Sequence, residues 1–226
     1  MKQFTRQGSI ILKSIILALI LLGTIFTFVF HDYRGEVFCY YTAQCNMIAF
    51  IVVAVLLVFD CFGGIRKERY YYMIKFFITM CSLLSLLVYT DLFTHTEQMK
   101  LANPWYAVIT HAVVPLLLLA DYLIFDRKGK TTWYTPALCG LGPIAHVIFI
   151  LLRGLTGEGY HIQDSATIVS APYHFLRSDT VSVLVTALGV LVGFLLFCYL
   201  FYLLDLGYAA LRDKFANTPK ETDQNA

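Results

Sequence analysis

The chain has 226 residues, of which 58% are hydrophobic and only 14% are charged, and its mean hydropathy is +0.68. A soluble domain of this size could not cover so much apolar surface, so the composition excludes that class and predicts an integral membrane protein. The formal net charge of +2 is too small to indicate a nucleic-acid partner.

Six apolar segments are long enough to cross about 30 Å of hydrocarbon as helices. They are continuous, whereas the strands of a membrane barrel would be short and alternating. The first segment lacks a small-residue cleavage site and is interpreted as a retained signal anchor. We therefore predict an all-α, polytopic bundle of six transmembrane helices over residues 1–206, and a tail at 207–226 that is disordered at its end. In chain order the segments lie near residues 9–30, 39–62, 72–93, 105–125, 134–153 and 180–206.

The positions of lysine and arginine predict the orientation. Basic residues outside the spans gather on one side of the predicted membrane, namely Lys2, Arg6, Arg66, Lys67, Arg69, Arg127, Lys128, Lys130, Arg212, Lys214 and Lys220. The other side holds only Arg34, Lys100, Arg153 and Arg177. Because cytoplasmic loops carry the excess of positive charge, we predict a multi-pass protein of the cell membrane with both termini in the cytoplasm.

Four ionisable residues fall near the cytoplasmic ends of the spans, namely Asp60, Lys75, Asp121 and Asp205. Side chains at such positions can reach the interface or pair with a neighbouring charge, so we expect interfacial anchors and one or two ion pairs. The six cysteines show no C-x-x-C spacing and are interpreted as small apolar residues. A thiol oxidoreductase is therefore disfavoured.

Polar residues also occur in the outer half, beginning with the stretch "CYYTAQCN" at 39–46. Thr42 and Asn46 share one face of the second span, while Gln44 points to another face. His111 lies about two turns below the outer surface on the fourth span, and His146 lies at a similar depth on the fifth. There is also a structural alternative for these residues. Thr42 would then cap the helix, and Asn46 or a lone histidine would form a hydrogen-bonded bridge between helices.

This pattern has a chemical interpretation if Thr42 and His111 meet. A threonine hydroxyl attacks an ester only when a base takes its proton, and histidine is the natural base near neutral pH. Asn46 and Gln44 are candidate donors to an oxyanion, and Asp91 is a candidate to orient the histidine. Pro115 removes the helical partner of the His111 carbonyl, so we expect an irregular helix there.

Three segments resemble signatures of one family. The sequence "FCYYTAQCNMIAFIVVAVLL" (38–57) resembles the F-T-x-Q-S-N signature of the bacterial Pr-six-Pr membrane proteins, and "ITHAVVPLLLLADYLIF" (109–125) resembles their H-x-x-x-P-L-L-x-x-x-D-W helix. The loop "APYHFL" (171–176) is similar to their Y-P-Y-P-F-L motif. The three motifs occur in the expected order.

That family is in turn distantly similar to the androgen-induced membrane hydrolases, including the androgen-dependent TFPI-regulating protein. The resemblance implies a six-span enzyme that takes lipid or fatty-acid esters from the bilayer, with Thr42 as nucleophile, His111 as base and no cofactor. His146, Tyr173 and His174 are expected to support the site. The signature serine is Cys45 here, and His174 replaces the second proline of the loop motif.

Two other functions stay open at this point. In the first, His111 and His146 bind a metal together with Asp91 or His174, or bind haem as axial ligands. In the second, the protein is a transporter or a non-catalytic membrane subunit. The pair Gly189 and Gly193 would let another helix approach the sixth span closely, within the chain or in a dimer, and the sequence does not indicate an oligomeric state.

Overall fold

The structure, a computed structural model, describes residues 2–30, 34–62, 69–95, 105–156, 160–161, 168–169 and 180–216. The described part is almost entirely helical. Its elements are α1 (Lys2–Phe30), the 3-10 helix η1 (Arg34–Cys39), α2 (Tyr41–Phe62), α3 (Arg69–His95), α4 (Trp105–Val108), the π-helix η4 (Ile109–Val113), α5 (Val114–Phe125), α6 (Thr135–Cys139), α7 (Leu141–Leu155), β1 (Tyr160–His161), β2 (Ile168–Val169) and α8 (Thr180–Ala216).

Six of the helical stretches are long and apolar enough to cross a membrane, which confirms the predicted fold class. They are residues 6–30, 41–62, 69–89, 105–125, 135–155 and 184–214. The fourth consists of α4, η4 and α5, and the fifth consists of α6 and α7, which join at Gly140. The sixth was expected to end near residue 206, but its helix continues to Ala216.

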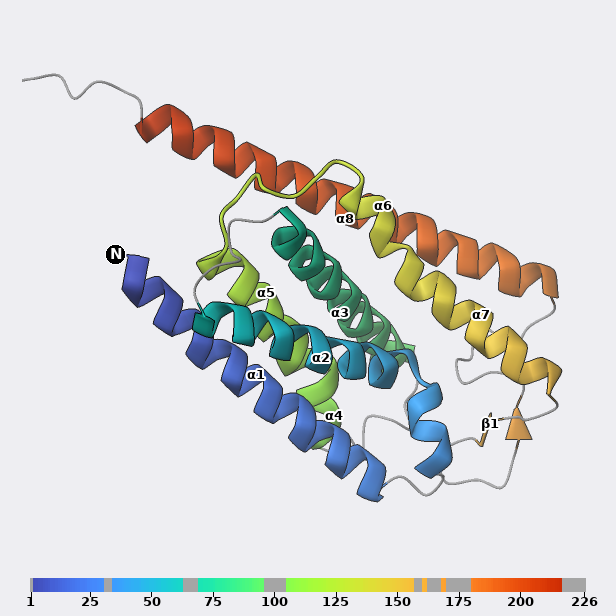
Figure 1. Cartoon of the computed structure of the whole chain (residues 1–226). Helices are drawn as coiled ribbons and strands as arrows, with labels where there is room; N and C mark the ends of the chain where they lie inside the picture. The colour runs from blue at the N-terminus through green and yellow to red at the C-terminus, as the bar shows by residue number, and fades with distance from the viewer. Residues whose placement is uncertain are drawn as a thin grey trace, which may run out of the picture.

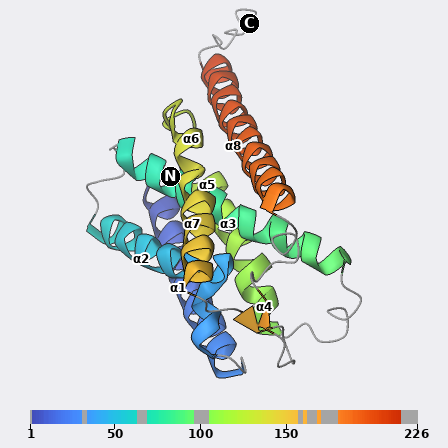
Figure 2. The ribbon, with the colours of Figure 1, turned by 90° about the vertical axis from the view of Figure 1, so that its right-hand side faces the viewer.

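Helices α1, α2, α3 and α5 pack against one another, and α3 also contacts α6 (Figure 1). Helix α3 is the central one, because 72% of its most apolar 18-residue stretch is buried inside the structure, whereas the corresponding share for α8 is 11%. Figure 2 shows α8 standing apart from α1 and α2. Strands β1 and β2 form a two-residue antiparallel pair between α7 and α8.

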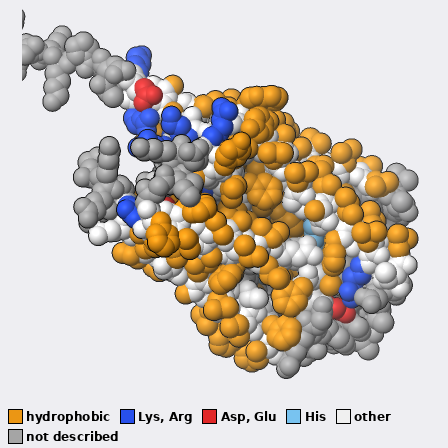
Figure 3. Space-filling model, in the orientation of Figure 1, with side chains coloured by type: hydrophobic (Ala, Val, Ile, Leu, Met, Phe, Trp, Pro, Cys, Tyr) orange, Lys and Arg blue, Asp and Glu red, His pale blue; other side chains and the backbone are white. Residues whose placement is uncertain are grey.

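The surface has the character expected of a membrane protein. Hydrophobic side chains cover most of the face seen in Figure 3, and lysines and arginines gather where α1 begins and α8 ends. Many large apolar residues are exposed on the helices, including Leu184, Leu196 and Leu204 on α8. Exposed apolar surface on this scale is stable in lipid and not in water. The described fold therefore defines a six-helix, multi-pass membrane protein.

Of the two alternatives for Gly189 and Gly193, close packing within the chain is not observed among the described residues, and a dimer contact stays a prediction. No atom of another element lies within 4 Å of a Cβ built on either glycine. Gly23 on α1 has the role that was expected of them, because a Cβ there would lie 2.5 Å from the Thr110 side chain. The approach of α1 to the π-helix thus depends on Gly23.

Gly129 forms the turn that follows α5, and it gives a testable prediction. Its φ is +71°, its N–H donates to the Asp205 carboxylate at 2.7 Å, and an added Cβ would lie 2.8 Å from the Cβ of Ala209. We expect Gly129→Ala to lower the free energy of unfolding in detergent by about 1–2 kcal/mol. The control Gly154→Ala on α7, where a Cβ meets no atom within 4 Å, should cost nothing or stabilise. Equal losses in the two variants would contradict this explanation.

Candidate functional site

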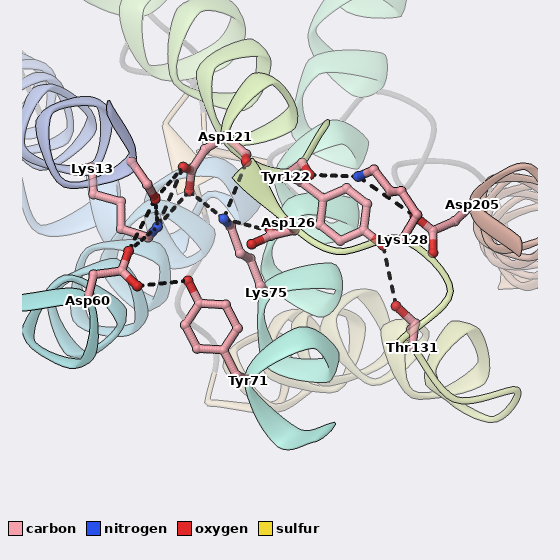
Figure 4. Close-up of polar contacts among 11 residues, drawn as sticks. Lys13, Asp60, Tyr71, Lys75, Asp121, Tyr122, Asp126, Lys128, Thr131 and Asp205 are labelled. Carbon is pink, nitrogen blue, oxygen red and sulfur yellow. Dashed lines mark hydrogen bonds and ion pairs between the residues drawn. The ribbon is translucent and has the colours of Figure 1, made fainter. Parts of the chain in front are cut away.

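A cluster of buried charges joins four helices at the end of the bundle where α1 begins (Figure 4). Lys13 on α1 lies 2.9 Å from the Asp60 carboxylate on α2 and 3.1 Å from the Asp121 carboxylate on α5. The Ser9 hydroxyl, one turn before Lys13, lies 3.1 Å from an oxygen of each carboxylate and can donate its one proton to either. Because three helices converge on Lys13, its charge is fully paired although its side chain is only 1% exposed.

Lys75 on α3 extends this cluster. Its ammonium group lies 2.8 Å from the Asp121 carboxylate and 2.7 Å from that of Asp126, which follows α5. Tyr71, one turn before Lys75, donates its hydroxyl to Asp60 at 3.4 Å. We call Lys13, Asp60, Lys75, Asp121 and Asp126 the charge cluster; it contains two ammonium groups and three carboxylates.

A separate ion pair holds α8 to the turn after α5. Lys128 lies 3.7 Å from the Asp205 carboxylate, donates to the Tyr122 carbonyl at 2.7 Å, and sits 4.0 Å from the centre of the Tyr122 ring. Burial lowers the pKa of Lys128 below the usual lysine range. Asp205 thus receives both this cation and the Gly129 N–H, which explains why α8 is anchored at this point.

These contacts correct one prediction. Asp60, Lys75, Asp121 and Asp205 were expected to reach the interface as anchors or to pair with a nearby charge, and they are at most 5% exposed, so the anchoring role was wrong. Asp60 and Asp121 pair inside the bundle with Lys13, a residue not singled out in the sequence, and Asp205 pairs with Lys128. The expected ion pairs exist, but they form a buried network.

Near the opposite end of the bundle, polar side chains of α2 and α3 meet. The Ser85 hydroxyl donates to the Thr42 hydroxyl at 3.0 Å, and both residues are buried. On the same two helices, the Cys45 thiol lies 3.6 Å from the Ser82 hydroxyl. A hydrogen bond donated to Thr42 stabilises negative charge on its oxygen, which is what attack by that oxygen requires.

His111 lies on the irregular turn of the fourth span. Its Nδ1 is 2.8 Å from the Ala107 carbonyl and 3.0 Å from the Thr110 hydroxyl. A carbonyl can only accept, so Nδ1 carries the proton and Nε2 of the neutral ring is left as the basic nitrogen. The ring stacks on Tyr89 with 4.5 Å between centroids. This is the tautomer that a general base at Nε2 needs.

The irregular turn itself follows from Pro115. The N–H of Val114 bonds to the carbonyl of Ile109, five residues earlier, which is the pattern of a π-helix. Pro115 offers no N–H to His111, and the helix accommodates this loss with a single wide turn. The irregularity expected at His111 is thus confirmed, and it takes the form of a π turn.

Asn46 connects α2 to this turn. Its side-chain amide donates to the Thr110 carbonyl at 3.3 Å, so the second and fourth spans touch here. The contact is the helix bridge that was considered as an alternative for Asn46. It uses one of the two amide N–H groups and leaves the second for another acceptor.

Gln44 and His146 form a neighbouring contact on a different face of α2. His146 Nδ1 lies 2.9 Å from the Gln44 side-chain oxygen, and the Gln44 amide nitrogen donates to the Phe38 carbonyl at 3.1 Å. The His146 ring packs against Tyr41 with centroids 5.3 Å apart. Gln44 therefore orients His146 and does not point toward Thr42.

His146 and Tyr41 line a cavity of about 280 Å³ between α3, α7 and α8. Its other walls are apolar and include Leu84, Ile144 and Leu188. In Figure 3 a histidine is visible within the hydrophobic face. The two histidines thus lie in different surroundings, because His146 lines an apolar cavity, whereas His111 bonds to Ala107 and Thr110 and stacks on Tyr89.

The candidate site therefore combines Thr42, Ser85, Tyr89, His111 and Asn46. Thr42 contacts Ser85, which lies one turn before Tyr89, and Tyr89 contacts His111. Asn46, one turn from Thr42, contacts the residue before His111. Thr42 and His111 are not hydrogen-bonded to each other in the described structure, but both belong to a ring of contacts that is closed by the backbones of α2 and α3.

The remaining predicted site residues are not brought into this ring by the described structure. Asp91 lies on α3, but its side chain is outside the described residues, as are Tyr173 and His174. Sequence reasoning missed Ser85, Tyr89 and Thr110. The available signal was the recurrence of hydroxyl groups along the third span, at Thr79, Ser82 and Ser85.

The metal-binding interpretation gains no support from the grouping of side chains. Among the described residues, no three His, Cys, Asp or Glu side chains are close enough together to hold a metal ion. The partners of His111 and His146 also differ, as described above.

Comparison of the chain with protein-family models, with curated proteins and with solved structures gives no match.

Proposed function

We propose that the protein is an intramembrane hydrolase of lipid or fatty-acid esters, related to the Pr-six-Pr and androgen-induced families that its motifs resemble. It acts in the cell membrane with both termini in the cytoplasm, as the distribution of basic residues favours. The observation that carries the proposal is the ring of contacts that holds the Thr42–Ser85 hydroxyl pair and the Nδ1-protonated His111 in one part of the bundle.

In this mechanism His111 Nε2 takes the proton of the Thr42 hydroxyl while the oxygen attacks the ester carbonyl. Collapse of the tetrahedral intermediate leaves the acyl group on Thr42, and His111 returns the proton to the departing alcohol. Water then attacks the acyl group with His111 again as base, releasing the acid and restoring Thr42. Catalytic hydrogen bonds commonly tighten only when substrate binds. The direct hydrogen bond between Thr42 and His111 therefore forms in the complex with the ester substrate.

Two other residues have defined roles in this proposal. Ser85 donates to Thr42 and lowers the energy of its developing alkoxide. The second N–H of the Asn46 amide is the candidate donor to the oxyanion. Gln44, considered earlier for that task, is committed to His146 and Phe38.

The histidines provide the test. With a fluorogenic fatty-acyl ester in micelles, we expect His111→Gln to lower kcat/KM by about 10²- to 10⁴-fold, because the general base is lost. His146→Gln is the matched control, since that ring bonds to Gln44 beside the apolar cavity, and it should stay within a few-fold of the parent protein. A larger loss in His146→Gln than in His111→Gln would reject His111 as the base.

A further inference from the structure

A row of polar side chains runs along one edge of α3, the most buried of the spanning helices. Its members recur every three or four residues and fall within about a third of the helix circumference. From the charge cluster outward they are Tyr71, Lys75, Thr79, Ser82, Ser85 and Tyr89. The five residues from Tyr71 to Ser85 are at most 2% exposed.

Both ends of this row meet groups that exchange protons. Lys75 belongs to the charge cluster, and Tyr89 stacks on His111. The rise from Lys75 to Tyr89 is about 21 Å, which is most of the hydrocarbon thickness. The row therefore extends from one titratable site to the other across the greater part of the bundle.

Among the described residues, the carboxylates of the charge cluster outnumber its ammonium groups by three to two, so the cluster can hold an exchangeable proton. The nearest further cation on α1 is Arg6, which donates to the backbone carbonyls of Asp60 and Cys61. Lys128 is paired with Asp205. Burial of Asp126, which lies outside the spans, raises the pKa of its carboxyl above the usual range.

Thr79 is the independent sign that the row does more than hold helices together. Its hydroxyl is completely buried and has no hydrogen-bond partner within the described part of the chain. Leaving a buried hydroxyl unpaired costs about 1–3 kcal/mol, so such a group needs an explanation. The preceding residue of α3, Ile78, packs in an apolar cluster with Ala49, Val53, Val114 and Leu118 at this level of the bundle.

We propose that this edge of α3 is a proton pathway, in which Thr79, Ser82 and Ser85 relay protons between the charge cluster and His111. Each hydroxyl accepts a proton from one side and releases its own to the other, so no group changes chemically. Water entering beside Thr79 and between the other hydroxyls completes the relay, and the apolar cluster around the neighbouring Ile78 places the gate at this level of the bundle. The inference does not depend on ester cleavage.

The test uses the purified full-length chain in vesicles of phosphatidylcholine and phosphatidylglycerol that contain a pH-sensitive dye. After a pH jump, with valinomycin and potassium to balance charge, the parent protein should admit protons faster than protein-free vesicles. Thr79→Val keeps the side-chain shape without the hydroxyl and should lower this flux about tenfold, because the gate can no longer hold water. Thr79→Ser should restore it.

The matched control is Thr27→Val on α1, where the hydroxyl donates to the Gly23 carbonyl of its own helix at 2.8 Å. It should keep the parent flux. A parent rate equal to that of protein-free vesicles would overturn the proposal, as would equal rates in Thr79→Val and the parent protein. Equal losses in Thr79→Val and Thr27→Val would also overturn it.

Discussion

Replacing Lys75 by methionine should destabilise the protein by about 3–5 kcal/mol at neutral pH, since removing one partner of a buried ion pair leaves uncompensated charge. Methionine retains most of the side-chain volume but removes the cation. Asp126 then loses the ammonium group 2.7 Å away, and Asp121 keeps only Lys13. The measurement is the free energy of unfolding in detergent, and Arg212→Met at the exposed end of α8 should change it by less than about 0.5 kcal/mol.

The loss of stability in Lys75→Met should depend on pH in a defined direction. The pKa of the buried Asp126 carboxyl is already raised in the folded protein, so its contribution to stability is greatest below the usual aspartate pKa and declines as pH rises through the folded value. Removing Lys75 raises that pKa further. The difference between the Lys75→Met variant and the parent should therefore be small in acid and grow toward neutral pH.

A second substitution separates charge from packing. If excess negative charge causes the loss, Lys75→Met combined with Asp126→Asn should recover part of the stability at neutral pH, because one unpaired carboxylate is removed. A Lys75→Met variant as stable as the parent protein at every pH would show that the charge cluster does not hold the four helices together.

The helices were predictable from the sequence because length and hydropathy are local properties. The predicted ends of spans two and four, at residues 62 and 125, coincide with the observed helix ends. The irregular turn was also predictable from a local property. Pro115 has no N–H, so the carbonyl of the residue one turn earlier loses its helical hydrogen bond. The extension of α8 to Ala216 was missed because its last turns are polar and leave no hydropathy signal.

Contacts between helices were predicted less well. Lys13 interrupts a run of apolar residues, but which carboxylates it meets depends on how α1, α2 and α5 are rotated relative to one another. Residue spacing shows which side chains share a face of one helix, but it does not show which other helix that face contacts. Gly189 and Gly193 show the same limit, because their spacing predicted a close approach within the chain or in a dimer, and the described chain shows none.

Only part of the candidate site was predicted, because the sequence does not indicate which helices face each other. Thr42 and His111 were chosen by residue type and motif, and their depth on the two spans was inferred from helix geometry. Ser85 was missed because a serine in an apolar helix commonly bonds within its own helix. Its role became visible only when α3 was placed against α2, with the Ser85 hydroxyl 3.0 Å from that of Thr42.

The second large effect concerns Thr42 and its covalent chemistry. A lipid-like fluorophosphonate should react with the hydroxyl that His111 activates, and Thr42→Val should abolish labelling because valine keeps the shape and removes the nucleophile. Ser14→Ala is the control, since the exposed Ser14 hydroxyl bonds to the Ile10 carbonyl on α1 and should not affect labelling. Undiminished labelling of Thr42→Val would exclude Thr42 as the nucleophile.

The most direct test of ester cleavage in this bundle is to locate the fluorophosphonate adduct by tandem mass spectrometry of the labelled full-length protein. We expect the adduct on Thr42, in the segment that begins α2, and its loss in His111→Gln. An adduct on Ser85 would reverse the roles of the two hydroxyls. A parent protein that carries no adduct on either residue would contradict the proposed hydrolase.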